Sequence, residues 1–252
     1  MHKLGLVLSG GGARSVAHLG ILQGLEDIGL RPGAIAGASA GAVLGALYAA
    51  GHSPKQILEA VKTAAGTGFI NKIFSGSGLF TVSGLTQFFK DTGLPARFED
   101  LAMPLWVSAT DLQTCQPVSF SKGALHKALI GSCAVPGVFS PVHFSGACLA
   151  DGGILDNLPV TEIRLVCDTL VGSNVNNIDP SIPKKISRLQ VIDRCFHLLI
   201  APQVAASARR CDYYLEPNLH RFPMFELKHP DQLFKAGYKA IMEQEKQLSG
   251  LR

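Results

Sequence analysis

The chain lacks several features that mark common classes of protein. Its 252 residues carry a net charge of only +4, and the clearest basic stretches are isolated pairs, Lys184-Lys185 and Arg209-Arg210. Because nucleic-acid binding needs a concentrated positive surface, we expect no nucleic-acid partner. No apolar run approaches the ~20 residues of a membrane-spanning helix. Internal repeats and low-complexity segments are also missing.

Cysteine is present, but not in a pattern that binds metals or forms a redox motif. The chain has six cysteines: Cys115, Cys133, Cys148, Cys167, Cys195 and Cys211. They show no C-x-x-C spacing, and most lie in apolar surroundings, which is typical of small core residues in a reducing compartment. No cluster of metal ligands stands out, and we expect neither a metal nor a cofactor.

A signal-peptide pattern is also missing. Met1-His2-Lys3 is followed only by the short run Leu4–Leu8 before the first glycines, which is the length of a strand. We therefore expect a cytoplasmic location, with contact to membranes only at their surface.

Strand and helix patterns alternate along the chain, and 47% of its residues are hydrophobic, which fits a buried parallel sheet. The predicted strands are 4–8, 34–37, 106–110, 117–120, 142–144, 147–150, 167–175 and 213–215. The predicted helices are 15–28, 40–50, 54–65 with Ser53 as its cap, 124–130, 186–200 and 231–248. This alternation predicts an α/β fold, a three-layer α/β/α sandwich with a mostly parallel central sheet.

The most informative segment runs from Gly37 to Gly41 and reads G-A-S-A-G. It joins a short apolar strand to an apolar helix, which is where a nucleophile elbow exposes its serine, here Ser39. The positive end of the following helix favours negative charge at that serine. A strand-to-helix turn of small residues with an incidental serine would give the same pattern.

Two further segments contain chemically suggestive residues. Gly10, Gly11 and Gly12 follow the first strand and open a helix, where backbone N–H groups can bind an anion. The acidic residue of a dinucleotide fingerprint and the Gly-Lys-Ser/Thr of a P-loop are both missing, so an oxyanion site is favoured over a nucleotide site. Asp151 ends another strand and is followed by Gly152 and Gly153, which alone could be an ordinary turn.

The glycine loop, the G-x-S-x-G segment and the Asp-Gly-Gly segment, in this order, resemble the patatin-like phospholipase family. The resemblance extends to residues 132–139, to 151–159 and to a tail similar to that of compact bacterial members, so it covers nearly the whole chain. It implies a single patatin-like domain over 1–252, with a catalytic core of about 4–164 and C-terminal strands and helices over about 165–252. One departure is Ser15, where the family's glycine loop usually ends in glycine.

The resemblance also implies roles for individual residues. Ser39 would be the nucleophile and Asp151 its base, and the N–H groups of Gly10, Gly11 and Gly12 would bind the oxyanion. Gly37, Gly41, Gly152 and Gly153 would support these motifs. Arg14 would do so too, although an exposed charge or a structural ion pair explains it as well. The implied activity is that of a serine lipid acyl hydrolase, a phospholipase, lysophospholipase or related carboxylic-ester hydrolase, with a lipid or acyl-ester substrate.

Two alternative functions remain open beside the serine hydrolase, and one segment is predicted to contact lipid or the core. An α/β-hydrolase with a Ser-Asp-His triad would use His197, His220 or His229. A non-catalytic lipid-binding regulator on the same fold has only Ser15 in its favour. Residues 66–82 mix Gly and Ser with large apolar residues from about Phe69 to Phe80, which predicts either core packing or a lid that contacts lipid. Acyl chain length, hydrolysis versus acyl transfer and oligomeric state are left open.

Overall fold

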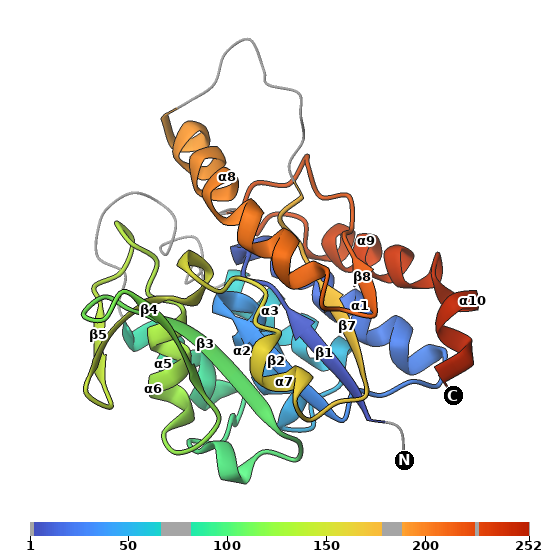
Figure 1. Ribbon diagram of the computed structural model, residues 1–252, viewed down its shortest axis with the longest axis horizontal. Coiled ribbons are helices and arrows are strands. Elements are labelled where there is room, and N and C mark those ends of the chain that lie inside the picture. Colours follow the sequence, from blue (N-terminus) through green and yellow to red (C-terminus); the bar gives the residue numbers. More distant parts are fainter. Residues whose placement is uncertain (1–2, 67–81, 178–187, 225–226, 252) are drawn as a thin grey trace.

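The computed structural model describes residues 3–66, 82–177, 188–224 and 227–251, and these form an eight-stranded sheet with helices on both faces (Figure 1). The strands are β1 (Leu4–Leu8), β2 (Ala34–Ala38), β3 (Leu105–Asp111), β4 (Gln116–Phe120), β5 (Val142–Phe144), β6 (Ala147–Asp151), β7 (Thr169–Ser173) and β8 (Tyr213–Leu215). The helices are α1 (Val16–Asp27), α2 (Ser39–Ala49), α3 (Pro54–Gly66), α5 (Val82–Asp91), α6 (Leu125–Ser132), α7 (Thr161–Arg164), α8 (Arg188–Ala208), α9 (Pro230–Met242) and α10 (Glu245–Leu248). Short 3-10 turns are η1 (Gly12–Ser15), η2 (Phe98–Asp100), η3 (Gly152–Ile154) and η4 (Ser249–Leu251).

The sheet is mostly parallel, as the alternating pattern predicts. Its order is β5-β6-β3-β2-β1-β7-β8, with β4 paired to β3 outside this path. The five strands from β3 to β8 in that order are mutually parallel, whereas β4 and β6 run antiparallel to β3. Because β1 and β2 are parallel neighbours, the loops that follow them lie side by side at one edge of the sheet.

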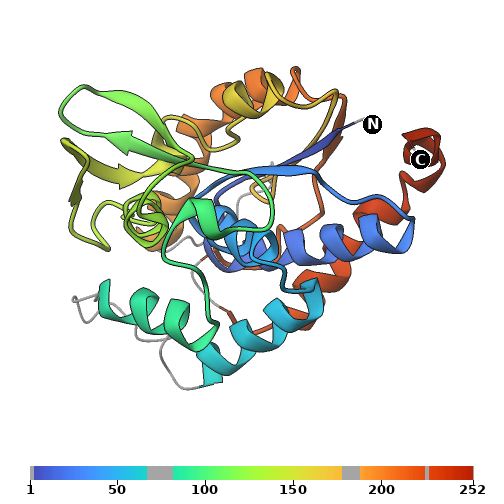
Figure 2. The ribbon, with the colours of Figure 1, turned by 90° about the horizontal axis from the view of Figure 1, so that it is seen from below.

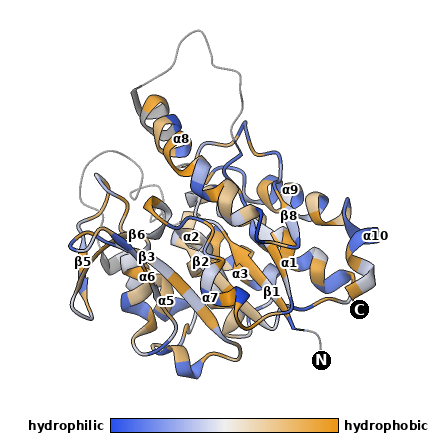
Figure 3. Ribbon diagram, in the orientation of Figure 1, coloured by the Kyte–Doolittle hydropathy of each residue, from blue (hydrophilic) through white to orange (hydrophobic). Residues whose placement is uncertain are grey.

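Alternate residues of the central strands point into two separate hydrophobic cores, one on each face of the sheet. The fold therefore has three layers, with helices on both sides of the sheet. Leu6 and Leu8 of β1 pack into the larger core with α1, α2 and α9, whereas Val7 points into a second core. That second core includes Ile200 and Val204 of α8. Figure 2 shows α8 on one side of the sheet and α1 with α9 on the other, and Figure 3 shows apolar residues along the central strands.

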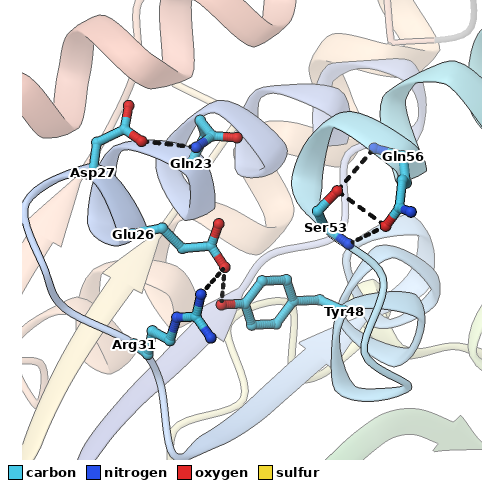
Figure 4. A network of polar contacts seen from close by, with 7 residues as sticks. All are labelled: Gln23, Glu26, Asp27, Arg31, Tyr48, Ser53 and Gln56. Atoms are coloured by element: carbon cyan, nitrogen blue, oxygen red, sulfur yellow. Dashed lines mark hydrogen bonds and ion pairs between the residues drawn. The ribbon is translucent and has the colours of Figure 1, made fainter.

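Side-chain hydrogen bonds fix the helices of the larger layer to one another. The hydroxyl of Tyr48 on α2 donates to Glu26 of α1 at 3.0 Å, and Arg31 lies 3.9 Å from the same carboxylate (Figure 4).

Ser53 is the predicted cap of α3, and Figure 4 shows its contacts with Gln56. The Ser53 hydroxyl accepts the Gln56 N–H at 3.3 Å, and the Gln56 side chain accepts the Ser53 N–H at 2.9 Å. This reciprocal pair is a capping box, and it confirms the prediction.

Two helix predictions need correction, and two helices were missed. Helix α8 continues to Ala208, although Pro202 favours an earlier end; the helix turn around Leu198 is exposed, so water can bond the carbonyl that loses its partner. The predicted helix 231–248 is interrupted at Gln244, whose side chain donates to the Tyr214 carbonyl at 3.3 Å. Helices α5 and α7 were not predicted, because they follow Gly/Ser-rich or Pro-containing segments that indicate loops.

Candidate functional site

Ser39 lies at a strained turn between β2 and α2. Strand β2 ends at Ala38, helix α2 begins at Ser39, and the φ of Ser39 is 51°. A positive φ is rare for a serine and typical of residues held in place at functional sites. A side chain at Gly41 would collide with the Ser9 carbonyl, so glycine is required for α2 to approach the end of β1. The G-x-S-x-G segment therefore forms the predicted elbow.

Asp151 contacts Ser39 directly, although the two residues are 112 positions apart. The Ser39 hydroxyl donates to Asp151 Oδ2 at 2.6 Å, and the Gly153 N–H donates to Asp151 Oδ1 at 2.8 Å. Gly152 allows the tight turn after β6, because a side chain there would collide with the Ser108 carbonyl. Both oxygens of the Asp151 carboxyl group thus have a donor, which fixes its orientation.

Burial changes the acid–base behaviour of this pair. Asp151 is 3% exposed and Ser39 is 8% exposed. Burial raises the pKa of Asp151 to about 6, because a charged carboxylate is poorly solvated there; the hydrogen bonds from Ser39 and Gly153 offset part of this rise. A carboxyl group with this pKa is ionised at neutral pH and is a stronger base than an exposed aspartate.

Three residues at the C-terminal end of α6 and directly after it, 132–134, hold both Ser39 and Asp151. The Ser39 N–H donates to Ser132 Oγ at 2.8 Å, and the Asp151 N–H donates to the Ala134 carbonyl at 2.9 Å. Cys133 lies between them, and burial raises the pKa of its thiol, with the negative charge of Asp151 as a second cause. Sequence reasoning placed these residues only in a segment of family resemblance, because no local pattern shows that a serine 93 positions away will accept the Ser39 N–H.

The glycine loop after β1 lies against the elbow. A methyl group on Gly10 would lie 3.1 Å from Ser39 Cβ. The Gly10 N–H donates to the Asn157 carbonyl at 3.3 Å, and the Gly10 carbonyl accepts from Asn176 at 2.5 Å. Among the described residues, no hydrogen bond uses the N–H of Gly11 or Gly12. These two groups therefore keep their hydrogen-bonding capacity for a ligand, whereas that of Gly10 has a protein partner.

Arg14 follows the glycine loop and is buried, not exposed. Its Nε donates to the Phe222 carbonyl at 2.7 Å, and Nη1 lies 3.5 Å from His197 Nε2. The side chain thus joins the loop to α8 and to the segment before α9. Ser15 is 1% exposed, and its hydroxyl has no hydrogen-bond partner in the described part of the chain.

The histidines that the structure describes do not take part in the Ser39–Asp151 contact. His18 is fully buried, with Nδ1 at 2.7 Å from Ser173 Oγ and Nε2 donating to the Ser9 carbonyl at 2.9 Å. Burial lowers the pKa of His18 to about 4, so its ring is neutral and structural. In the described ranges, no hydrogen bond joins any histidine to Ser39 or Asp151.

Three further features concern metal binding, membrane-spanning helices and the predicted lid. In the segments that the structure describes, no group of three or more His, Cys, Asp or Glu could hold a metal ion. Within those same segments, no helix has both the length and the apolarity needed to cross a membrane. The predicted lid from Phe69 to Phe80 lies outside the described residues.

Comparison with known proteins gives a consistent picture. A sequence model of the patatin-like phospholipase family matches residues 6–163. An uncharacterised NTE family protein of Mycobacterium bovis is 36% identical over 181 residues, covering 69% of this chain and 49% of its own. The lysophospholipase NTE1 of Candida glabrata is 33% identical over 195 residues, 72% of this chain and 11% of that protein. The lysophospholipase NTE1 of Saccharomyces cerevisiae is 32% identical over 71% of this chain and 11% of its own length.

Among solved structures, VipD from Legionella pneumophila superposes with a TM-score of 0.59 over 98% of this chain and 67% of its own. Its 17% sequence identity makes this a similarity of fold. Among the sequence relatives, the matched part of this chain spans about half of the mycobacterial protein and a much smaller share of the two fungal proteins.

Proposed function

This chain belongs to the patatin-like phospholipase family, and we propose that it is a serine lipid acyl hydrolase that works through a Ser39–Asp151 dyad. The observation that carries the proposal is the direct hydrogen bond from Ser39 Oγ to Asp151 Oδ2, at 2.6 Å and in a buried setting. A serine hydroxyl becomes a useful nucleophile only when a base removes its proton. Here the base is in contact with the nucleophile and is oriented by Gly153.

In the first half of the reaction, Asp151 accepts the proton of Ser39 while Ser39 Oγ bonds to the ester carbonyl carbon. The carbonyl oxygen becomes an oxyanion, for which the N–H groups of Gly11 and Gly12 are the proposed donors. Gly10 lies beside Ser39, and its N–H donates to the Asn157 carbonyl. Such a donor typically contributes roughly 10²–10³ in turnover. Asp151 then gives its proton to the leaving alcohol oxygen as the carbon–oxygen bond breaks, which leaves an acyl group on Ser39.

In the second half, Asp151 takes a proton from water as the water oxygen attacks the acyl carbonyl carbon. The bond to Ser39 Oγ then breaks, and Asp151 returns the proton to that oxygen. The products are a free fatty acid and the regenerated serine. A carboxyl group with a pKa of about 6 suits both directions of transfer, because it gains and loses a proton near neutral pH.

The substrate class is proposed from the relatives. Two matched fungal proteins are lysophospholipases, which favours a single-chain phospholipid ester as substrate. Because this chain covers 11% of each of those proteins, their substrate preference is a starting point for the assay. Nitrophenyl esters of increasing acyl length, run beside lysophosphatidylcholine, would measure both chain-length preference and headgroup dependence.

The decisive test compares the dyad with a triad. Ser39→Ala and Asp151→Asn should each lower kcat by several orders of magnitude, and the double variant should be little worse than either, because the two residues act as a unit. His197→Gln, His220→Gln and His229→Gln should stay within about tenfold of wild type, which is only ~1.4 kcal/mol of barrier.

A fluorophosphonate probe supplies the control for folding and nucleophile identity. It should label wild type and all three histidine variants at Ser39, and leave Ser39→Ala unlabelled. A folded histidine variant as inactive as Asp151→Asn would restore the triad. Complete absence of ester hydrolysis and of labelling in wild type would favour the lipid-binding regulator.

A further inference from the structure

Helix α8 has an outer face unlike that of an ordinary surface helix. Its exposed residues between positions 191 and 206, where side chains are described, are all apolar or thiol-bearing: Val191, Cys195, Leu198, Leu199, Pro202, Ala205 and Ala206. The exposed fractions are 43% for Val191, 53% for Leu198 and 79% for Leu199. These positions recur every three or four residues and therefore form one stripe along the helix, which we call the α8 stripe.

Helix α9 shows what the same fold does at a conventional surface. Its exposed residues are Asp231, Gln232, Lys235 and Lys239, and its apolar side packs on the core through Leu233 and Ile241. In α8 the distribution is partly reversed, since His197 and Ser207 are among the buried residues while leucines face outward. A contiguous exposed apolar surface of this kind marks a site of contact with another apolar surface.

The α8 stripe is attached to the candidate site. Gln203, one turn after Leu199, donates to Asp156 at 3.2 Å and accepts the Asn157 N–H at 3.3 Å, so it holds the turn that follows Asp151. His197 approaches Arg14 beside the glycine loop. Figures 1 and 2 show α8 lying across one face of the sheet, near the ends of β1 and β2. Helix α8 therefore contacts the segments that carry the candidate site, and the stripe lies on the exposed face of the same helix.

Charge favours one kind of contacting surface. The stripe is followed directly by Arg209 and Arg210, both exposed, and no exposed acidic residue interrupts it in the described part of α8. An apolar helix face bordered by arginines is the pattern of helices that lie in the interface of a membrane with anionic lipid.

From these observations, we propose that the α8 stripe docks the protein on an anionic lipid surface, with Leu198 and Leu199 entering the interface and Arg209 facing the headgroups. The choice of lipid as the contacting surface rests on the proposed function, since α8 contacts the segments that carry a site assigned to lipid esters. The docking would present the candidate site to lipid without extraction into water. This location differs from the region between Phe69 and Phe80 that the sequence indicated.

Vesicle binding tests the docking separately from turnover. The parent is the full chain with Ser39→Ala, which cannot form an acyl-enzyme, and the probes are vesicles of phosphatidylcholine alone or mixed equally with phosphatidylglycerol. Adding Leu198→Gln and Leu199→Gln should lower partitioning at least about tenfold on mixed vesicles, because two exposed leucines lose their apolar contact. Arg209→Gln should lower it about fivefold on mixed vesicles only.

Leu165 provides a matched control. It is 84% exposed and follows α7, near the ends where β1 and β7 begin and Leu4 pairs with Thr169. Leu165→Gln removes a leucine more exposed than either Leu198 or Leu199 and should leave partitioning unchanged. A polarity-sensitive fluorophore on Cys195, in a Cys115→Ser background, should shift to shorter wavelength on vesicles. The same dye on Leu165→Cys, with Cys115→Ser and Cys195→Ser, should not shift.

Several results would overturn the proposal. Partitioning that is unchanged by the leucine pair, or equally reduced by Leu165→Gln, would remove the α8 stripe from lipid contact. A dimer in light scattering that the leucine pair dissociates would make the stripe a contact between copies. Hydrolysis of a soluble butyrate ester by wild type, with no vesicle binding by the parent, would reject docking and keep the hydrolase. Stripe-dependent vesicle binding without any hydrolysis would keep docking and reject the hydrolase.

Discussion

The backbone N–H of Ser39 donates a hydrogen bond to the hydroxyl of Ser132 at 2.8 Å, and that hydroxyl donates in turn to the Ser108 carbonyl at 2.6 Å. Ser132 is fully buried, so neither bond is exchanged with water. The relay connects the strained elbow to α6 and to β3. It also means that the Ser39 N–H already has a partner, so it is not among the proposed oxyanion donors.

Replacing Ser132 tests the relay as a positioning device. Ser132→Ala leaves the buried Ser39 N–H and Ser108 carbonyl without their partner, which costs about 1–3 kcal/mol of folding free energy for each unsatisfied group. We expect kcat to fall by roughly tenfold to a hundredfold while KM changes little, since a small misplacement of a nucleophile is costly. Steady-state kinetics on a soluble ester would measure both constants.

The control for this prediction is Ser132→Cys, which keeps a weak donor and acceptor and should recover part of kcat. The apparent pKa of the activity should stay at the wild-type value in both variants, because Ser132 does not contact the Asp151 carboxyl group. A Ser132→Ala enzyme with unchanged kcat would show that the elbow holds Ser39 without this bond.

The positive φ of Ser39 predicts a trade-off between stability and activity. Glycine adopts a φ of 51° without strain, whereas alanine and serine do not. Ser39→Gly should therefore be more stable than Ser39→Ala by about 1 kcal/mol in urea unfolding, and both should be inactive. Equal stability of the two variants would argue that the elbow is relaxed.

The pKa of Asp151 predicts how activity depends on pH. The base must be ionised, and burial raises its pKa to about 6. We expect kcat/KM on a short soluble ester to be constant above pH 7, to halve near pH 6 and to fall tenfold per unit below it. A midpoint near 4, the value of an exposed aspartate, would contradict the burial argument.

The same pKa predicts that Asp151→Asn stabilises the fold at high pH. Because the folded-state pKa is raised above the unfolded value of 3.8, the contribution of Asp151 is favourable below pH 3.8 and is lost as the pH rises through about 6. Asp151→Asn should exceed wild type in stability at pH 8, by up to about 3 kcal/mol before any loss of hydrogen bonds. The difference should vanish near pH 3.5, which thermal unfolding at both pH values would measure.

His18 predicts a pH dependence of stability with the opposite sign. Its folded-state pKa is lowered from 6.5 to about 4, so its contribution is complete above pH 6.5 and is lost as the pH falls toward 4. A shift of this size corresponds to about 3 kcal/mol. Urea unfolding should show a shallower loss of stability between pH 6.5 and 4 for His18→Gln than for wild type. Parallel slopes would mean that folding does not lower the pKa of His18.

Much of the architecture could be predicted from the sequence, because it depends on short-range patterns. Apolar runs such as Leu4–Leu8, with helical patterns between them, indicate an α/β sandwich whatever the details of packing. The elbow at Ser39 is equally local, since its small neighbours and the following helix determine the turn. Helix boundaries were less predictable, because contacts such as Gln244 with Tyr214 come from distant parts of the chain.

What the sequence by itself determined is the set of candidate groups: a serine at an elbow, a glycine loop, and an aspartate before two glycines. Only the tertiary structure brought Ser39 within 2.6 Å of Asp151, gave the Gly10 N–H a protein partner and placed Ser132 under the elbow. It also placed Leu198 and Leu199 on the exposed face of α8, which the sequence analysis did not predict. The physical reason is that a side chain's pKa and its exposure are set by neighbours that folding brings from other strands and helices.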